Sequence, residues 1–346
     1  MARTGETQAR VGRKRLFRVL SIDGGGVRGI LAACLLDALE RKLRRASGRP
    51  DARLAEFFDL VAGTSTGALL ACLYLCPHPN VPRRARYSAA DALAFYQAMA
   101  PEVFALGVWR RIRTAGGLLD EIYPNSGLDG ALRKLVGDLR LARLLKPCLL
   151  TAYDIERRKT HFFTSRDAAA RPEKDFLVRD AARAATASPT YFEPARVRSA
   201  AGAAYSLIDG GVFACNPALC AYAEARGFPG RPTAADMALI SIGTGRRLKP
   251  YSFEAARNWG RVRWVGPLLD IMASATVETV DFVVRKLFEA SRAGGQYVRI
   301  EPELGRAASA MDDATASNLR LLLDAGRAAA RRHGAELDRA AALLAR

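Results

Sequence analysis

Histidine is scarce in this chain, with three residues among 346. A serine or cysteine nucleophile usually relies on a histidine base, so few positions are open to that role. Long apolar runs are also lacking: no stretch reaches the roughly eighteen apolar residues of a membrane-spanning helix. Residues 1–15 are polar and basic, so we expect a basic N-terminal tail and no secretory signal peptide.

Cysteines are few, and their spacing matches no zinc pattern. Most of the six lie inside apolar runs, and Cys72 and Cys76 fall on one face of an expected helix. We therefore expect buried free thiols in a reducing compartment. The predicted location is the cytoplasm, either free or peripherally attached to a membrane.

Positive charge dominates: 53 Lys and Arg face 35 Asp and Glu, a net charge of +18. The excess indicates either an anionic partner, such as a phospholipid surface, or simply the base composition of the gene. Arginine supplies 45 of the 53 basic residues and alanine is abundant, which is typical of GC-rich coding. This favours the second interpretation, and we expect no DNA or RNA partner.

Short apolar strands alternate with helical patterns up to residue 250, and the C-terminal third is mainly helical. This alternation predicts an α/β fold with a mostly parallel sheet covered on both faces. We expect a core over 16–250 and a helical part over 251–346 packed on the same domain. Expected strands are 16–22, 57–62, 147–153, 160–164, 204–208, 238–242 and 296–300; expected helices are 29–46, 68–76, 88–99, 127–138, 176–186, 216–225, 254–259, 268–291 and 315–345.

The pentapeptide GTSTG at 63–67 follows an expected strand and precedes an expected helix. This is the context of a nucleophile elbow, in which a sharp turn lifts Ser65 above the sheet and requires small neighbours such as Gly63 and Gly67. The N–H of Thr66, at the helix N-terminus, points to where an oxyanion would form. The alternative is a glycine-rich turn with a capping serine, but the flanking strand and helix favour a nucleophile.

None of the three histidines stands where a base for Ser65 is expected. His78 lies in a Pro-His-Pro turn, His161 begins a strand, and His333 lies in an arginine-rich helix. Each is better explained as a surface or packing residue. A carboxylate base is therefore the natural alternative.

Asp209 supplies such a carboxylate. It ends the apolar strand 204–208 and is followed by Gly210 and Gly211, which let another backbone or a substrate approach closely. Active residues of α/β sheets gather at the carboxyl ends of strands. The alternative is an ordinary Asp-Gly turn residue.

The heptapeptide DGGGVRG at 23–29 matches the G-x-G-x-x-G dinucleotide fingerprint through Gly24, Gly26 and Gly29. Arg28 falls inside the turn, and no strand ends in an acid about 20 residues later, as a ribose contact needs. Alternatively, the N–H groups of Gly24, Gly25 and Gly26 form a nest for an oxyanion. Arg28 would then add positive charge or anchor the loop.

Together, DGGGVRG, GTSTG and the DGG at 209–211 resemble, in order and spacing, the motifs of the patatin-like phospholipase family. Three further stretches are similar: TAYD at 151–154, ASPTYFEP at 187–194, and MDDAT at 311–315 followed by Asn318. The resemblance runs from about residue 16 to beyond residue 325, nearly the whole chain.

The resemblance implies a three-layer α/β/α sandwich and a lipid acyl hydrolase of phospholipase A or lysophospholipase type. Ser65 would be the nucleophile and Asp209 the general base of a Ser–Asp dyad, with backbone donors at Gly25, Gly26 and Thr66. The implied partner is a phospholipid or another acyl lipid at a membrane surface. No metal and no organic cofactor are implied.

Three questions stay open. Some bacterial patatin-like proteins are anti-phage effectors gated by cyclic nucleotides, and this chain resembles them in size, so a cyclic-nucleotide activator is one alternative. A nucleotide-binding or interaction protein that uses the GGGVRG loop is another. Residues 103–123, with Trp109 and several arginines, fit a membrane contact, a mobile lid or a basic surface loop. The sequence carries no sign of oligomeric state.

Overall fold

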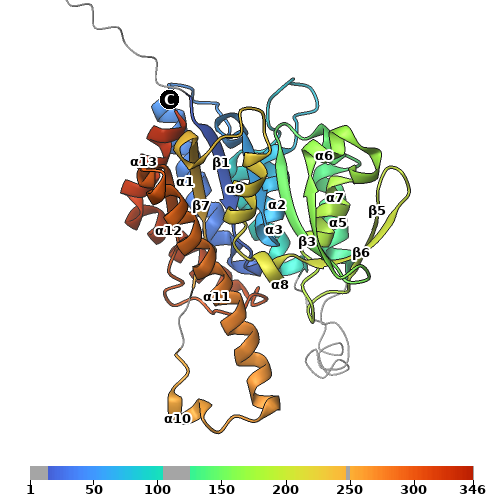
Figure 1. Cartoon of the computed structure of the whole chain (residues 1–346), viewed down its shortest axis with the longest axis vertical. Coiled ribbons are helices and arrows are strands. Elements are labelled where there is room, and N and C mark those ends of the chain that lie inside the picture. Colours follow the sequence, from blue (N-terminus) through green and yellow to red (C-terminus); the bar gives the residue numbers. More distant parts are fainter. Residues whose placement is uncertain (1–14, 104–124, 247–249, 346) are drawn as a thin grey trace, which may run out of the picture.

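The structure is a computed structural model that describes residues 15–103, 125–246 and 250–345. At its centre is an eight-stranded sheet with the neighbour order β5-β6-β3-β2-β1-β7-β8, and β4 pairs with β3 (Figure 1). The strands are β1 Phe17–Ile22, β2 Leu60–Gly63, β3 Cys148–Asp154, β4 Lys159–Thr164, β5 Ala195–Arg198, β6 Ala204–Asp209, β7 Met237–Ile242 and β8 Tyr297–Ile300.

Strand direction divides the sheet into two parts. β3, β2, β1, β7 and β8 are parallel neighbours, whereas β4 and β6 run antiparallel to β3, and β5 runs antiparallel to β6. The predicted mostly parallel sheet is therefore confirmed. The sequence analysis missed β5, because ARVR is short and alternates charged with apolar residues.

Helices cover both faces of the sheet, which confirms the predicted three-layer sandwich. Along β1, Val19 packs into the core beneath α9 and α11, while Leu20 and Ile22 pack into the core beneath α1, α2 and α12. The larger helices are α1 Gly29–Ser47, α2 Thr66–Leu75, α3 Ala89–Val103, α5 Asn125–Val136, α7 Val178–Ala185, α9 Ala218–Arg226, α11 Arg261–Ala290, α12 Ala316–Arg332 and α13 Gly334–Leu344; α6 Ser165–Ala170, α8 Gly211–Ala214 and α10 Phe253–Ala256 are short.

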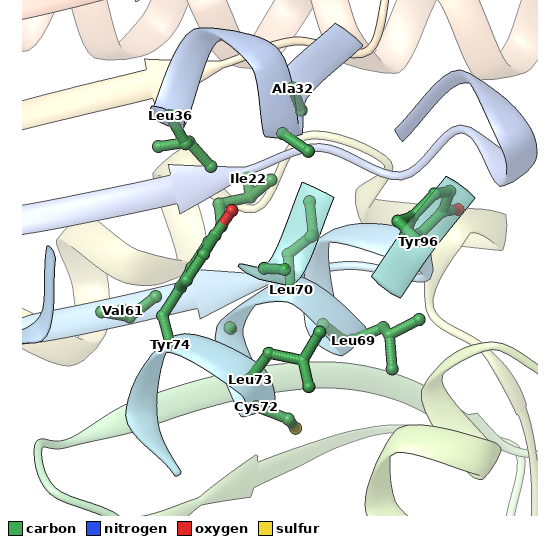
Figure 2. Close-up of a cluster of buried hydrophobic side chains, with 14 of the residues drawn as sticks. Ile22, Ala32, Leu36, Val61, Leu69, Leu70, Cys72, Leu73, Tyr74 and Tyr96 are labelled. Carbon is green, nitrogen blue, oxygen red and sulfur yellow. The ribbon is translucent and has the colours of Figure 1, made fainter. Parts of the chain in front are cut away.

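Helix α2 is buried on every side. All ten of its residues are buried, which is typical of a helix that is apolar all round. Figure 2 shows Leu70 and Tyr74 of α2 among Ile22 of β1 and Leu36 of α1. The turn that begins α2 is therefore fixed to the centre of the molecule.

The C-terminal part joins the same sheet. β8 extends it beside β7, and α12 and α13 pack against α1. The expected single helix over 315–345 is two helices that meet at His333. The expected helix over 268–291 begins earlier, at Arg261, so Pro267 lies inside it. Within the described ranges, no helix is both long enough and apolar enough to cross a membrane.

Candidate active site

Ser65 stands at the turn between β2 and α2, with an unusual backbone conformation. Its φ is 52° and its ψ is −124°, a region that residues with a side chain seldom adopt. A Cβ at Gly63 would overlap Gly67, and a Cβ at Gly67 would overlap the carbonyl oxygen of Ile22. The motif glycines are thus needed for the tight turn that projects Ser65 from the strand.

Asp209 reaches Ser65 because β2 and β6 share one neighbour. β4 pairs with β3 along residues 149–154 and fills one side of that strand. On the other side, β2 pairs with residues 148–150 and β6 with residues 152–154, running in opposite directions. The carboxyl ends of β2 and β6 therefore approach each other head to head. The sequence predicts Asp209 at the carboxyl end of a strand in a mostly parallel sheet. In the structure, the strand that ends at Asp209 runs antiparallel to β3.

The Asp209 carboxylate is buried and accepts a 2.7 Å hydrogen bond from the N–H of Gly211. The Ser65 hydroxyl faces this carboxylate closely enough to lower its pKa as a donor. Burial raises the pKa of Asp209 to about 6, although the Ser65 hydroxyl and the Gly211 N–H act to lower it. The group is therefore ionised at neutral pH and is a stronger base than an exposed aspartate.

The glycine loop after β1 is fixed through its carbonyl groups. The Gly24 carbonyl accepts a 2.6 Å hydrogen bond from Oγ1 of Thr244, which directly follows β7. The Gly25 carbonyl accepts from the backbone N–H and the Nε of Arg28. A Cβ at Gly25 would overlap the side chain of Thr244, so only glycine fits there.

Some N–H groups of this loop are hydrogen-bonded within the fold, and others are free to face the site. The Gly24 N–H donates to the carbonyl of Cys215 at 2.9 Å, so its predicted place in the oxyanion hole is wrong. The N–H groups of Gly25, Gly26 and Thr66 have no acceptor within the described part of the chain. Since a Cβ at Gly24 would contact Ser65, the free donors belong to a loop that lies against the nucleophile.

Tyr96 of α3 joins the two turns. Its hydroxyl donates to the carbonyl of Gly26 and hydrogen-bonds Oγ1 of Thr66. Because the phenol proton is used on Gly26, the Thr66 hydroxyl must be the donor in the second bond. Burial raises the pKa of Tyr96 to about 12, so it remains a donor at working pH. A Cβ at Gly29 would overlap this Thr66 hydroxyl.

A buried ion pair supports the loop from below. Arg299 of β8 donates to both carboxylate oxygens of Asp23, at 2.9 and 2.6 Å, and also to Ser241 and Glu301. Burial raises the pKa of Asp23 to about 6, while Arg299 opposes this, and we take Asp23 as ionised. The partly buried Arg28 is an anchor through its bond to Gly25, and burial lowers its pKa.

The three further family-like stretches, TAYD, ASPTYFEP and MDDAT, also contribute residues to this region. The Thr151 hydroxyl bonds Oγ1 of Thr64 at 2.7 Å, the Ala187 carbonyl accepts from the N–H of Asp209, and the Met311 carbonyl accepts from the N–H of Val27. A Cβ at Gly210 would overlap Thr151.

Among the described residues, neither Ser65 nor Gly211, the two groups that face the Asp209 carboxylate, is a histidine. His161 lies among the rings of Phe163, Phe176 and Tyr205, and burial lowers its pKa to about 4, so it is a neutral core residue. His78 accepts from the N–H of Asn80 in a surface turn. The structure thus places two of the three histidines where the packing interpretation expected them.

Sequence reasoning missed Tyr96, Thr244, Cys215 and Arg299. One signal was available for Thr244: Gly243-Thr244-Gly245 follows β7 just as the other glycine motifs follow β1 and β2. The expected lid with Trp109 lies almost entirely outside the described residues.

Comparison with known proteins identifies the family. The family profile described as patatin-like phospholipase matches residues 20–222. Patatin-like protein 2 of Oryza sativa is 33% identical over 340 residues, covering 90% of this chain and 83% of that protein. Patatin-04/09 of Solanum tuberosum is 31% identical over 344 residues, covering 94% and 86%.

Two further similarities were found. A protein of Solanum tuberosum named Probable inactive patatin-3-Kuras 1 is 31% identical over 343 residues, covering 94% of this chain and 89% of that protein. The crystal structure of VipD from Legionella pneumophila covers 94% of this chain and 67% of that one, with a TM-score of 0.40 and 13% identity. The family profile and the relatives of more than 30% identity decide the assignment: this chain belongs to the patatin-like phospholipase family.

Proposed function

We propose that this protein is a lipid acyl hydrolase in which Ser65 is the nucleophile and Asp209 the general base. The family supports acyl hydrolysis of lipids. One relative carries the words "probable inactive" in its name, so family membership alone does not decide activity. The meeting of the β2 and β6 ends, which brings the Ser65 hydroxyl to the buried Asp209 carboxylate, is the single observation that carries the proposal.

The proposed reaction has two halves. Asp209 accepts the Ser65 proton as the hydroxyl oxygen attacks the ester carbonyl, and the alcohol leaves with that proton. The N–H groups of Gly25, Gly26 and Thr66 stabilise the oxyanion. Asp209 then deprotonates a water molecule that attacks the acyl-enzyme, and it returns this proton to the Ser65 oxygen as the fatty acid leaves. The raised pKa of Asp209, about 6, makes this carboxylate a better base than an ordinary aspartate.

The glycine-loop alternative receives less support. A dinucleotide loop needs several free N–H groups, but those of Gly24, Val27 and Arg28 all have acceptors within the chain. The Asp209 carboxylate, close to Ser65, would also repel a phosphate. An oxyanion of an ester is a smaller ligand that needs only the two or three donors left free.

A cyclic-nucleotide activator remains a prediction without a specific site. A cavity of about 390 Å³ is lined by Arg133, Arg179 and Arg183. However, Arg179 pairs with Asp138 and Arg183 pairs with Asp129, so these two cations are already neutralised. We therefore do not extend the proposal to this cavity.

The test is hydrolysis of a short-chain soluble ester and fatty-acid release from phosphatidylglycerol-containing vesicles. Ser65→Ala should lower kcat by a factor on the order of 10⁵ to 10⁶, and Asp209→Asn by about 10⁴. The matched controls are Ser47→Ala, on the far part of α1, and Asp51→Asn, and both should keep the wild-type rate. A folded Ser65→Ala variant with the wild-type rate would contradict the proposal.

A further inference from the structure

The segment between β7 and the second half of α11 forms an arm that projects from the body. The arm comprises residues 251–272, that is, α10, the residues after it and the first half of α11 (Figure 1). Its large apolar side chains are exposed: Tyr251, Phe253, Trp264, Val265, Leu268, Ile271 and Met272. In the described chain, this is where most of the exposed large apolar residues gather.

Five of the exposed apolar residues of the arm lie on one face of α11. Trp264, Val265, Leu268, Ile271 and Met272 are spaced i, i+1, i+4, i+7 and i+8, so they form a single stripe. The acidic residue of this half, Asp270, falls on the opposite face and accepts a hydrogen bond from Tyr251. The stripe is thus continuous and free of acidic charge.

This stripe is not a continuation of the core stripe. In the second half of α11, Val277, Val284 and Phe288 are buried against the sheet. At about 100° per residue, the core stripe is roughly half a turn around the helix from the exposed one. The body of the protein therefore cannot cover the exposed stripe, which faces a partner or solvent.

The residues beside the stripe fit an anionic membrane surface. The rings of Tyr251, Trp259 and Trp264 pack edge to face, and aromatic rings of this kind favour the boundary between lipid and water. Arg261 lies on the face of the stripe, three residues before Trp264, and Arg263 directly precedes Trp264, about 100° around the helix. Among the described residues, no ion pair involves either arginine. Basic side chains beside an apolar stripe bind anionic lipid headgroups.

The arm also follows a strand that ends at the candidate active site. β7 ends at Ile242, Thr244 holds the glycine loop through Gly24, and the arm begins at residue 251. α11 then returns to pack against α8, which begins directly after Gly210. A surface that receives the arm would therefore lie beside the sheet edge that carries Ser65 and Asp209.

We infer that the arm docks the protein on an anionic phospholipid bilayer, with the stripe of α11 and Phe253 inserted at the headgroup boundary. The inference rests on the proposed lipid substrate, but membrane binding can be measured without hydrolysis. It assigns the contact to the arm instead of to the Trp109 segment.

Binding is tested in the full chain with Ser65→Ala, so that the vesicles stay intact. The protein should co-float with phosphatidylcholine vesicles that contain phosphatidylglycerol, and bind less at high salt. Phe253→Ser, Val265→Ser and Leu268→Ser combined should weaken binding about tenfold or more. Arg261→Gln and Arg263→Gln should each weaken it about fivefold. The control is Phe282→Ser, since Phe282 is similarly exposed on the body half of the same helix.

Tryptophan fluorescence locates the contact, because the chain has three tryptophans and two of them are in the arm. In Trp109→Phe, lipids brominated on the acyl chain should quench Trp259 and Trp264. Quenching in Trp259→Phe/Trp264→Phe, but not in Trp109→Phe, would overturn the inference and favour the Trp109 segment. Sedimentation is the second check: if the triple serine variant separates a dimer and keeps vesicle binding, the arm contacts a second copy instead.

Failure of the two proposals is distinguishable. The triple serine variant, with Ser65 intact, should hydrolyse the short-chain soluble ester at the wild-type rate and release less fatty acid from vesicles. Vesicle binding without ester hydrolysis in wild type would remove the proposed function and keep the arm. Ester hydrolysis by the wild type, together with unchanged vesicle binding in the triple variant, would keep the proposed function and remove the role of the arm.

Discussion

The turns after β1 and β2 look alike in sequence, since each runs from strand through glycines into helix, but they are held differently. The first turn is fixed from outside: Thr244, Cys215 and Met311 all hydrogen-bond its backbone. In the second turn the backbone is held mainly by its own helix, through the bonds of Gly67 to Thr64 and of Ala68 to Ser65, and the contacts from outside are made by the side chains of Thr64 and Thr66.

This difference matches the two tasks in the proposed reaction. A loop that offers free N–H groups must have its carbonyls turned away and occupied, and that requires donors from elsewhere in the chain. A nucleophile needs only a projecting position, which a strained φ on a buried helix provides. Changes at the first turn should therefore damage transition-state stabilisation. Relief of the backbone strain at the second turn should instead alter local stability.

Among variants that keep both Ser65 and Asp209, the largest effect is expected for Gly25→Ala. Its methyl group would overlap the side chain of Thr244 and shift the loop, so the N–H donors would be misplaced. We expect kcat on the soluble ester to fall by about 10² to 10³, with Ser65 still present. Gly130→Ala, where a Cβ meets nothing within 4 Å, is the control and should leave kcat unchanged. An unchanged kcat in Gly25→Ala would remove the loop from catalysis.

The pH profile of the reaction tests Asp209 as the proposed general base. Asp209 works only when it is deprotonated, and burial raises its pKa to about 6. Thus kcat/KM should be flat above about pH 7 and fall about tenfold for each unit below pH 6. Asp23, whose pKa is also raised to about 6, is the control: Asp23→Asn should keep this acid limb. Loss of the acid limb in Asp23→Asn would mean that the limb reports the ionisation of Asp23 and not of Asp209.

Tyr96→Phe separates the two turns without adding bulk. It removes the hydroxyl that joins the carbonyl of Gly26 to Thr66, so we expect kcat to fall several-fold, with stability lower by about 1 kcal/mol. Tyr87→Phe is matched, because its hydroxyl also donates to a carbonyl, that of Leu135, far from the turns. Equal losses of kcat in both variants would mean that Tyr96 acts through stability alone.

The smallest effect concerns the strain at Ser65. Glycine accepts a φ of 52° readily, whereas alanine keeps the strain. Ser65→Gly should therefore exceed Ser65→Ala in free energy of unfolding by about 1 kcal/mol, measured by denaturant titration. The same substitution at Ser274, in the middle of α11, should have the opposite sign, since glycine destabilises a regular helix. A less stable Ser65→Gly would show that the turn is not strained.

The sequence predicted the strands that carry the motifs and the layers of the fold, because both depend on local apolar pattern. Ser65 and Asp209 could be singled out because each lies in a glycine-rich turn at the end of an expected strand. The direction of β6 could not be predicted from the sequence, because the alternation of apolar residues is the same in parallel and antiparallel strands. The partners of the glycine loop were also hidden, because Thr244 and Arg299 are hundreds of residues from Gly24 and only the folded sheet brings them close.

The head-to-head meeting of β2 and β6 has a consequence for folding. Ser65 and Asp209 are far apart along the chain, yet a single residue of β3, Thr151, separates their strand ends. Such a contact closes a long loop and forms late in folding. A one-residue slip of either strand along β3 would turn its last side chain to the opposite face. Recovered esterase activity should therefore report complete refolding, with native pairing along both halves of β3, and lag behind the recovery of helical signal.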